Sequence, residues 1–159
     1  MQLDTITELL QIPGYKVRHM VSCTGNRIEL LLEREGERAR VCSGCGKVHT
    51  TAVHSEGSVL LEDLPISGKR VYLHVPKRKA VCPEDGSIRV EELKWVRGRF
   101  TKRFADQVYR LTAITTNKEA GWFLGIDDET VYRLDKGMLE ELALEKIEKV
   151  KSPRHMSVD

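Results

Sequence analysis

The spacing of hydrophobic residues changes once along this chain of 159 residues. Up to about residue 99, apolar and polar residues tend to alternate, which is the period of half-buried β-strands. From Phe100 onward, apolar residues recur every three or four positions, as they do in amphipathic helices. The pattern therefore predicts an α+β fold, in which a small β-rich module precedes three helices.

The β-rich part is predicted to open with a short helix over Thr5–Gln11. Two extended segments, Tyr15–Cys23 and Arg27–Glu33, then flank the turn-forming pair Gly25-Asn26, which favours a hairpin. A further alternating strand follows the Ser67-Gly68 turn, with inward positions at Val71, Leu73 and Val75.

Helical spacing is clearest in the last third of the chain. The first predicted helix carries an apolar stripe made of Phe100, Phe104, Val108 and Leu111. Thr116 and Glu119 have the spacing of a capping box, so a second helix should begin there. The third helix should begin near Asp127 or Asp128, with a stripe made of Val131, Leu134, Met138 and Leu142. We divide the chain into the β-rich module 1–94, the helical domain 95–148 and a terminal segment 149–159.

Three of the four cysteines have the spacing of a zinc site. Cys42 and Cys45 form a Cys-x-x-Cys-Gly knuckle, from which two thiolates can reach one metal ion. Cys82 follows a predicted strand, as a third ligand does in a zinc ribbon. The β-rich module is thus predicted to be zinc-ribbon-like, and bound Zn²⁺ would supply stability that so small a sheet lacks.

The fourth ligand is ambiguous. By spacing, Asp85 ranks first, because it lies where a second Cys-x-x-Cys would have its last cysteine. His54 and then His49 are the alternatives, since both follow the knuckle closely. Cys42 and Cys45 could also be two ordinary buried thiols. We expect Cys23 to be a small apolar core residue.

Positive charge is concentrated in one stretch of the chain. The formal net charge is only +2, yet residues 69–103 contain eleven lysines and arginines and four acids, a local charge of +7. Such an excess attracts polyanions. A solvated basic face without a partner is the alternative.

Residues 117–136 fit a DNA-binding helix-turn-helix. Ala120 and Gly121 are small where two helices would cross, and Gly125 permits the sharp turn. The second helix would enter the major groove of double-stranded DNA, where Arg133 suits guanine. The predicted DNA-binding residues are Arg97, Arg99, Lys102, Arg103, Thr130, Tyr132, Arg133 and Lys136. A plain three-helix core is the alternative, and Trp95, Trp122 and Phe123 are expected to be buried.

The order of these motifs resembles one family. Leu-Leu-Gln-Ile-Pro-Gly-Tyr, the Cys-x-x-Cys-Gly knuckle, Leu-Glu-Asp-Leu-Pro, Arg-Phe-Thr-Lys-Arg-Phe-Ala and Thr-Val-Tyr-Arg-Leu-Asp-Lys follow one another as in the N-terminal region of ISL-three family insertion-sequence transposases. The resemblance covers essentially the whole chain. It departs at Cys82-Pro-Glu-Asp-Gly, where many relatives have a second cysteine pair.

The resemblance implies a zinc finger and a helix-turn-helix that together recognise terminal inverted repeats. In full-length relatives a ribonuclease-H-like domain follows, and it cuts DNA with three carboxylates and divalent metal ions. Asp159 would be the first of these carboxylates, but one acid cannot build a two-metal site. As it stands, the chain is expected to bind DNA without being an enzyme. A homodimer is a further expectation, because transposases act on paired ends, although no heptad repeat supports it.

Composition agrees with a cytoplasmic protein. It is 40% hydrophobic and 31% charged, and no apolar stretch approaches the roughly 20 residues that cross a bilayer. The sequence leaves two other functions open: a stand-alone DNA-binding regulator or repressor, and a metal-stabilised protein-interaction module.

Overall fold

The computed structural model describes residues 3–36 and 40–151 and contains both helices and strands, so the α+β prediction is confirmed. The chain divides into two compact units, Met1–Phe104 and Ala105–Asp159, and each is described separately. The described strands all lie in the first unit. No described helix is long and apolar enough to span a membrane.

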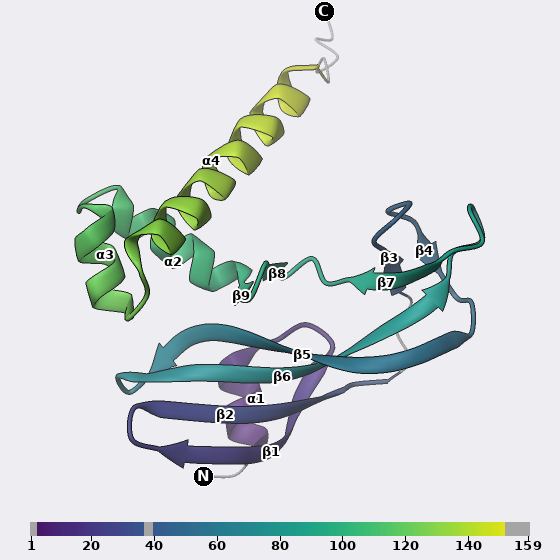
Figure 1. The fold of residues 1–159 in the computed structure, drawn as a ribbon, viewed down its shortest axis with the longest axis horizontal. Coiled ribbons are helices and arrows are strands. Elements are labelled where there is room, and N and C mark those ends of the chain that lie inside the picture. The colour runs from purple at the N-terminus through teal and green to yellow at the C-terminus, as the bar shows by residue number, and fades with distance from the viewer. Residues whose placement is uncertain (1–2, 37–39, 152–159) are drawn as a thin grey trace, which may run out of the picture. The chain divides into compact units, whose positions relative to one another are not determined.

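The four longest described strands of the first unit pair within its nine-stranded sheet (Figure 1). β1 (Tyr15–Thr24) and β2 (Arg27–Arg34) form the predicted antiparallel hairpin. β2 also pairs in parallel with β6 (Lys69–Val81), and β6 pairs antiparallel with β5 (Val53–Ile66). The parallel pairing joins segments that are far apart in the sequence, so local alternation could not predict it.

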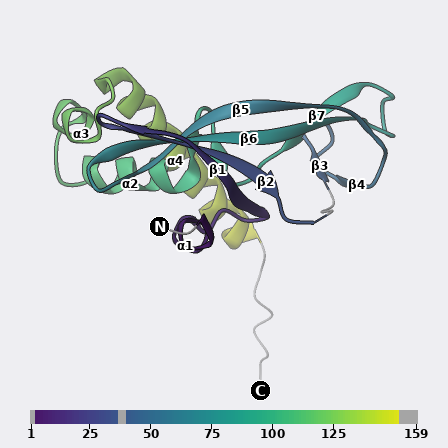
Figure 2. The ribbon, with the colours of Figure 1, turned by 90° about the horizontal axis from the view of Figure 1, so that it is seen from below.

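The core of this unit lies between the sheet and α1 (Leu3–Leu10), which covers one face of the sheet (Figure 2). Ile6 and Leu10 of α1 are buried against alternate residues of β2 and β6, among which Leu30 and Leu73 are fully inaccessible. Because side chains alternate across a strand, the intervening residues face away from α1.

Two short strands continue the sheet before the helices begin. β8 (Val96–Arg97) pairs with β9 (Phe100–Thr101), and β9 pairs with β5 at Glu62. Phe100 and Thr101 are therefore buried. The Thr101 hydroxyl accepts a hydrogen bond from the backbone N–H of Phe104, in the first turn of the following helix.

The helices are α2 (Lys102–Thr112), α3 (Asn117–Leu124) and α4 (Asp128–Lys151). The predicted capping box is confirmed: the Thr116 hydroxyl accepts from the Glu119 N–H, and the Glu119 carboxylate accepts from the Thr116 N–H. α4 includes residues 149–151, the start of the predicted terminal segment. Asp159 lies outside the described residues.

Three predictions of burial are wrong. Cys23 is exposed, because it lies near the end of β1, which pairs only with β2. Trp122 and Phe123 are 86% and 67% exposed, because α3 buries Ala120, Gly121 and Leu124 instead. Trp95 is half-buried, and its ring meets that of Tyr15 edge-on at 5.6 Å.

Candidate metal centre

Two hairpins of the first unit meet at their turns. β3 (Arg40–Cys42) and β4 (Val48–His49) form one hairpin, and the end of β6 forms the other with β7 (Ile88–Glu92). β3 also pairs with β7, with Cys42 opposite Glu91, so the two hairpins are joined side by side. The turn of each hairpin is a cysteine knuckle, residues 42–46 in the first and 82–86 in the second.

The knuckles bring four metal-ligating side chains together: Cys42, Cys45, His49 and Cys82, with ligand atoms that all lie within 4.8 Å of one another. His49 Nε2 lies 3.0 Å from Cys45 Sγ and 3.9 Å from Cys82 Sγ. Thiolates around a tetrahedral zinc ion lie about 3.8 Å apart, given Zn–S bonds of about 2.3 Å. The donor types and their spacing fit a structural zinc site of three thiolates and one imidazole.

Backbone N–H groups donate hydrogen bonds to the knuckle sulfurs, which favours the charged thiolate form that binds a metal. The backbone N–H groups of Cys45 and then Gly44 donate to the Cys42 sulfur and lower the pKa of Cys42. Backbone N–H of Glu84 acts in the same direction on Cys82, but burial and the Cys42 and Cys45 sulfurs raise the pKa of Cys82 overall. Clustered thiolates repel one another, and Zn²⁺ removes this repulsion.

The structure does not place either of the first two candidates for the fourth ligand at the cluster. The Asp85 carboxylate accepts hydrogen bonds from the Ser87 N–H, the Ser87 hydroxyl and Arg89. His54 is exposed on β5 beside Ser55. His49, ranked third by sequence, lies in the cluster because β4 pairs with β3 and places His49 opposite Arg40.

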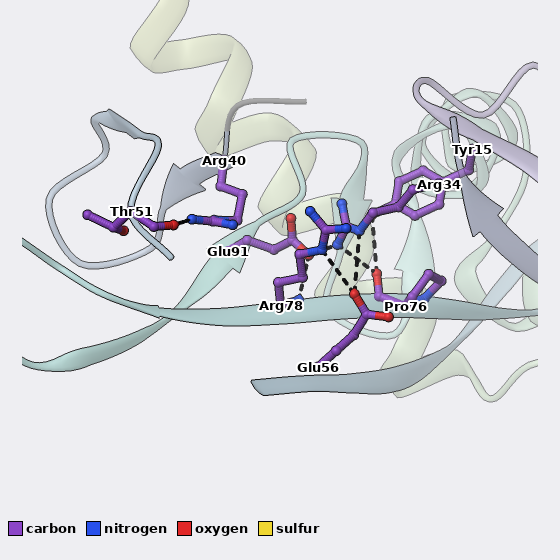
Figure 3. A network of polar contacts seen from close by, with 8 residues as sticks. All are labelled: Tyr15, Arg34, Arg40, Thr51, Glu56, Pro76, Arg78 and Glu91. Atoms are coloured by element: carbon purple, nitrogen blue, oxygen red, sulfur yellow. Dashed lines mark hydrogen bonds and ion pairs between the residues drawn. The ribbon is translucent and has the colours of Figure 1, made fainter. Parts of the chain in front are cut away.

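A buried ion network holds β7 to the main sheet next to this centre (Figure 3). Glu91 is 5% exposed, and it accepts hydrogen bonds from the Arg34 guanidinium and from the backbone N–H of Arg78, the latter at 2.6 Å. Arg34 also donates to the carbonyl of Pro76 at 3.1 Å, as does the Tyr15 hydroxyl at 3.2 Å. Burial raises the pKa of Tyr15 to about 12, so the hydroxyl remains a donor at neutral pH.

Arg103, predicted to contact DNA, is a structural residue within the first unit. Its guanidinium binds both oxygens of Asp63, with Nε at 2.7 Å from Oδ1, and it also donates to the carbonyl of Leu10. Asp63 is 1% exposed and accepts a third hydrogen bond from the Thr101 hydroxyl at 2.7 Å. Arg103 therefore has a structural partner, while about a third of its side chain stays exposed (33%), and its predicted DNA contact remains a prediction.

The neighbouring basic residues differ in exposure. Arg99 is exposed, and its guanidinium lies over the Phe100 ring at 5.5 Å. Arg97 and Lys102 are half-buried.

The predicted DNA-binding residues of α4 also include both exposed and buried side chains. Tyr132, Arg133 and Lys136 are exposed along one side of the helix. Thr130 is 3% exposed, its hydroxyl donates to the Asp127 carboxylate at 2.8 Å, and its backbone N–H donates to the same carboxylate. Thr130 thus belongs to the cap of α4, and its burial leaves little of its side chain open to a DNA contact.

The paired knuckles and the Cys₃His ligand set define the class as a zinc ribbon. Comparison with known families agrees: residues 38–85 match the model described as the zinc-finger of transposase IS204/IS1001/IS1096/IS1165. The chain is 34% identical over 109 residues to the transposase for insertion sequence element IS1001 of Bordetella parapertussis. That match covers 64% of the chain and 25% of the relative, so the chain spans about a quarter of the length of this curated relative. No solved structure matches. The zinc ribbon of this chain is thus similar to that of the IS204/IS1001/IS1096/IS1165 transposases, which supports the resemblance to the ISL-three family seen in the sequence.

Proposed function

We propose that this chain is the DNA-recognition region of a transposase and that it binds the terminal inverted repeats of an insertion sequence. The observation that carries the proposal is the row of exposed residues Tyr132, Arg133 and Lys136 on α4, in a chain that is similar to transposases. The cluster of metal-ligating side chains found in residues 3–36 and 40–151 is the zinc site. We assign recognition of DNA to this region, and cutting of DNA to carboxylates elsewhere in the transposase.

The junction between α3 and α4 supports a helix-turn-helix. Gly125 has φ 71°, a left-handed conformation that suits glycine, and its backbone N–H bonds the carbonyl of Gly121. A Cβ on Gly121 would lie 2.6 Å from the carbonyl oxygen of Ile126, so no other residue fits at this crossing. Ala120 and Val131 are fully buried between the helices. A fixed angle of this kind lets a second helix enter the major groove.

The acidic start of α4 is compatible with DNA binding. The Asp127 carboxylate caps the helix, and the Asp128 carboxylate accepts from the backbone N–H of Glu129 at 3.1 Å. Hydrogen bonds from Thr130 lower the pKa of Asp127. Asp127 and Asp128 thus satisfy the amide groups of the first turn. Arg133 follows on the exposed side, with its guanidinium 3.1 Å from the Thr130 hydroxyl. Arg97, Arg99 and Lys102 are proposed phosphate contacts.

Replacing Arg133 with alanine should selectively weaken recognition of the terminal repeat. An arginine that reads guanine contributes about 1–3 kcal/mol of discrimination, which corresponds to a loss of roughly 5- to 150-fold in affinity for the repeat. Fluorescence anisotropy of a labelled repeat and of a shuffled duplex measures both affinities in the same salt. The matched control is Lys146→Ala, which removes an exposed cation from the same helix, ten residues beyond Lys136. Equal losses for Arg133→Ala on both duplexes, or an equal effect of the control, would contradict this role.

A further inference from the structure

The two cysteine knuckles have the same backbone hydrogen bonds but different residues at their fourth position. In the first, Gly46 N–H bonds the Cys42 carbonyl at 2.9 Å; in the second, Gly86 N–H bonds the Cys82 carbonyl at 2.8 Å. These glycines have φ of 70° and 69°. Asp85 therefore occupies in the second knuckle the place that Cys45 occupies in the first.

The Asp85 side chain is held away from the thiolates by a set of local donors. Oδ1 accepts from the backbone N–H of Ser87 at 2.9 Å and from its hydroxyl at 2.7 Å, and Oδ2 accepts from Arg89 Nη2 at 2.7 Å. Both partners of the ion pair are about half exposed, at 43% for Asp85 and 45% for Arg89. A carboxylate that already accepts three hydrogen bonds is a poor candidate for a metal ligand.

Arg89 contacts both knuckles. Its guanidinium binds Asp85 of the second, and its side chain lies across Gly44 of the first. A Cβ on Gly44 would be 2.9 Å from Arg89 Nε and 3.1 Å from Arg89 Cδ, so this approach depends on the absence of a side chain. The guanidinium also lies close enough to the Cys42 and Cys82 sulfurs to interact with their charge. A cation here offsets the net negative charge of three thiolates around one Zn²⁺.

We propose that Arg89 is a positioning residue of the zinc site: together with Asp85 it closes the second knuckle onto the first, in place of a fourth thiolate, and leaves the fourth coordination position to His49. The Arg89–Asp85 ion pair thereby holds the second knuckle against the first through hydrogen bonds, whereas a cysteine at position 85 would do so by binding the metal. The proposal is independent of DNA binding and concerns only how the metal is held.

The test uses Co²⁺ as the probe in the whole 159-residue chain, because the thiolate absorption of Co²⁺ counts sulfur ligands and its visible bands report tetrahedral geometry. Arg89→Ala should keep the absorption of three thiolates but lose about 10- to 100-fold in Co²⁺ affinity, as changes next to metal ligands do. Arg89→Lys, which restores the charge without the planar fork, should recover part of this loss.

The control is Lys47→Ala. Lys47 and Glu84 also form an ion pair between the same knuckles, 2.9 Å long, and Lys47 likewise interacts with the charge of the Cys45 and Cys82 sulfurs. The two side chains are more exposed, at 64% and 50%, and it is Arg89 that lies against Gly44. This variant should bind Co²⁺ within about twofold of the wild type, since exposed pairs contribute little. Wild-type affinity in Arg89→Ala, or an equal loss in Lys47→Ala, would overturn the proposal.

A second pair of variants gives an answer even if Arg89→Ala does not fold. His49→Ala should bind Co²⁺ weakly, with three thiolates. Adding Asp85→Cys to His49→Ala should raise the sulfur absorption from three thiolates to four and restore affinity, because the metal itself then closes the second knuckle. If the absorption stays at three thiolates, position 85 is not equivalent to position 45 and the proposal fails.

Discussion

Replacing Cys45 with serine is expected to abolish stable zinc binding and to unfold the ribbon. Two thiolates and one imidazole would remain as ligands. Cys42 and Cys82 are almost fully buried, at 7% and 2% exposure, so without zinc their thiolate charges would repel each other inside the protein. Structural zinc contributes about 10–16 kcal/mol in small zinc modules, far more than the short strands β3 and β4 can supply. Bound zinc should fall from one ion per chain to none, as measured by metal analysis after gel filtration.

Hydrogen exchange separates this local unfolding from general unfolding. The backbone N–H groups of Cys42, Gly46, Cys82 and Gly86, which are hydrogen-bonded within the knuckles, should exchange rapidly in Cys45→Ser. Amides in the centre of β6 should stay protected, because Val71 and Leu73 are fully buried against the main sheet. Cys23→Ser is the control, since Cys23 is exposed and lies outside the cluster. Retention of zinc by Cys45→Ser would show that the cluster is not the metal site.

Replacing Arg103 with alanine should destabilise the first unit by about 3–5 kcal/mol, because it leaves the buried Asp63 carboxylate without its cation. Asp63 would keep only the Thr101 hydroxyl, at 2.7 Å, out of its present donors. The carbonyl of Leu10 would lose its partner as well. Urea denaturation of the zinc-bound protein measures the change in the free energy of unfolding.

Arg99→Ala is the matched control for this loss. Arg99 lies four residues earlier and is exposed, and the contact described for its side chain is with the Phe100 ring, while its backbone carbonyl accepts from the Glu62 N–H in any variant. Its replacement should change the free energy of unfolding by no more than about 0.5 kcal/mol. If the two variants are equally stable, the Asp63–Arg103 pair does not have the structural role assigned to it.

The sequence predicted the zinc knuckle because its information is local. Two thiols separated by two intervening residues, followed by a glycine, specify a turn that faces one ion. The fourth ligand depends on strand pairing: His49 reaches the cluster only because the β3–β4 hairpin places it opposite Arg40. Spacing favoured Asp85 because Asp85 lies where the second cysteine of the second knuckle would be. Spacing could not show that the Asp85 carboxylate instead accepts hydrogen bonds from Ser87 and Arg89.

The helices were predicted for the same reason, and the errors there have the same origin. The capping box and the apolar spacing around Val131 are properties of adjacent turns, and both are present. The charge of a residue in the sequence does not show which group that residue will contact in the fold. Arg103 and Arg99 look alike in sequence, yet one faces a buried aspartate of β5 and the other is exposed. Strand β5 itself, with exposed residues along its first half, lacked a clear alternating pattern.

We propose that this chain, stabilised by zinc, recognises a specific DNA end. The most direct measurement is the affinity of the full chain for the terminal inverted repeat of its own insertion sequence and for a shuffled duplex, by fluorescence anisotropy with and without a zinc chelator. We expect tighter binding to the repeat, a steep fall in affinity with salt, and a loss of preference when zinc is removed. Equal affinity for the two duplexes in the presence of zinc would contradict sequence-specific recognition by this chain.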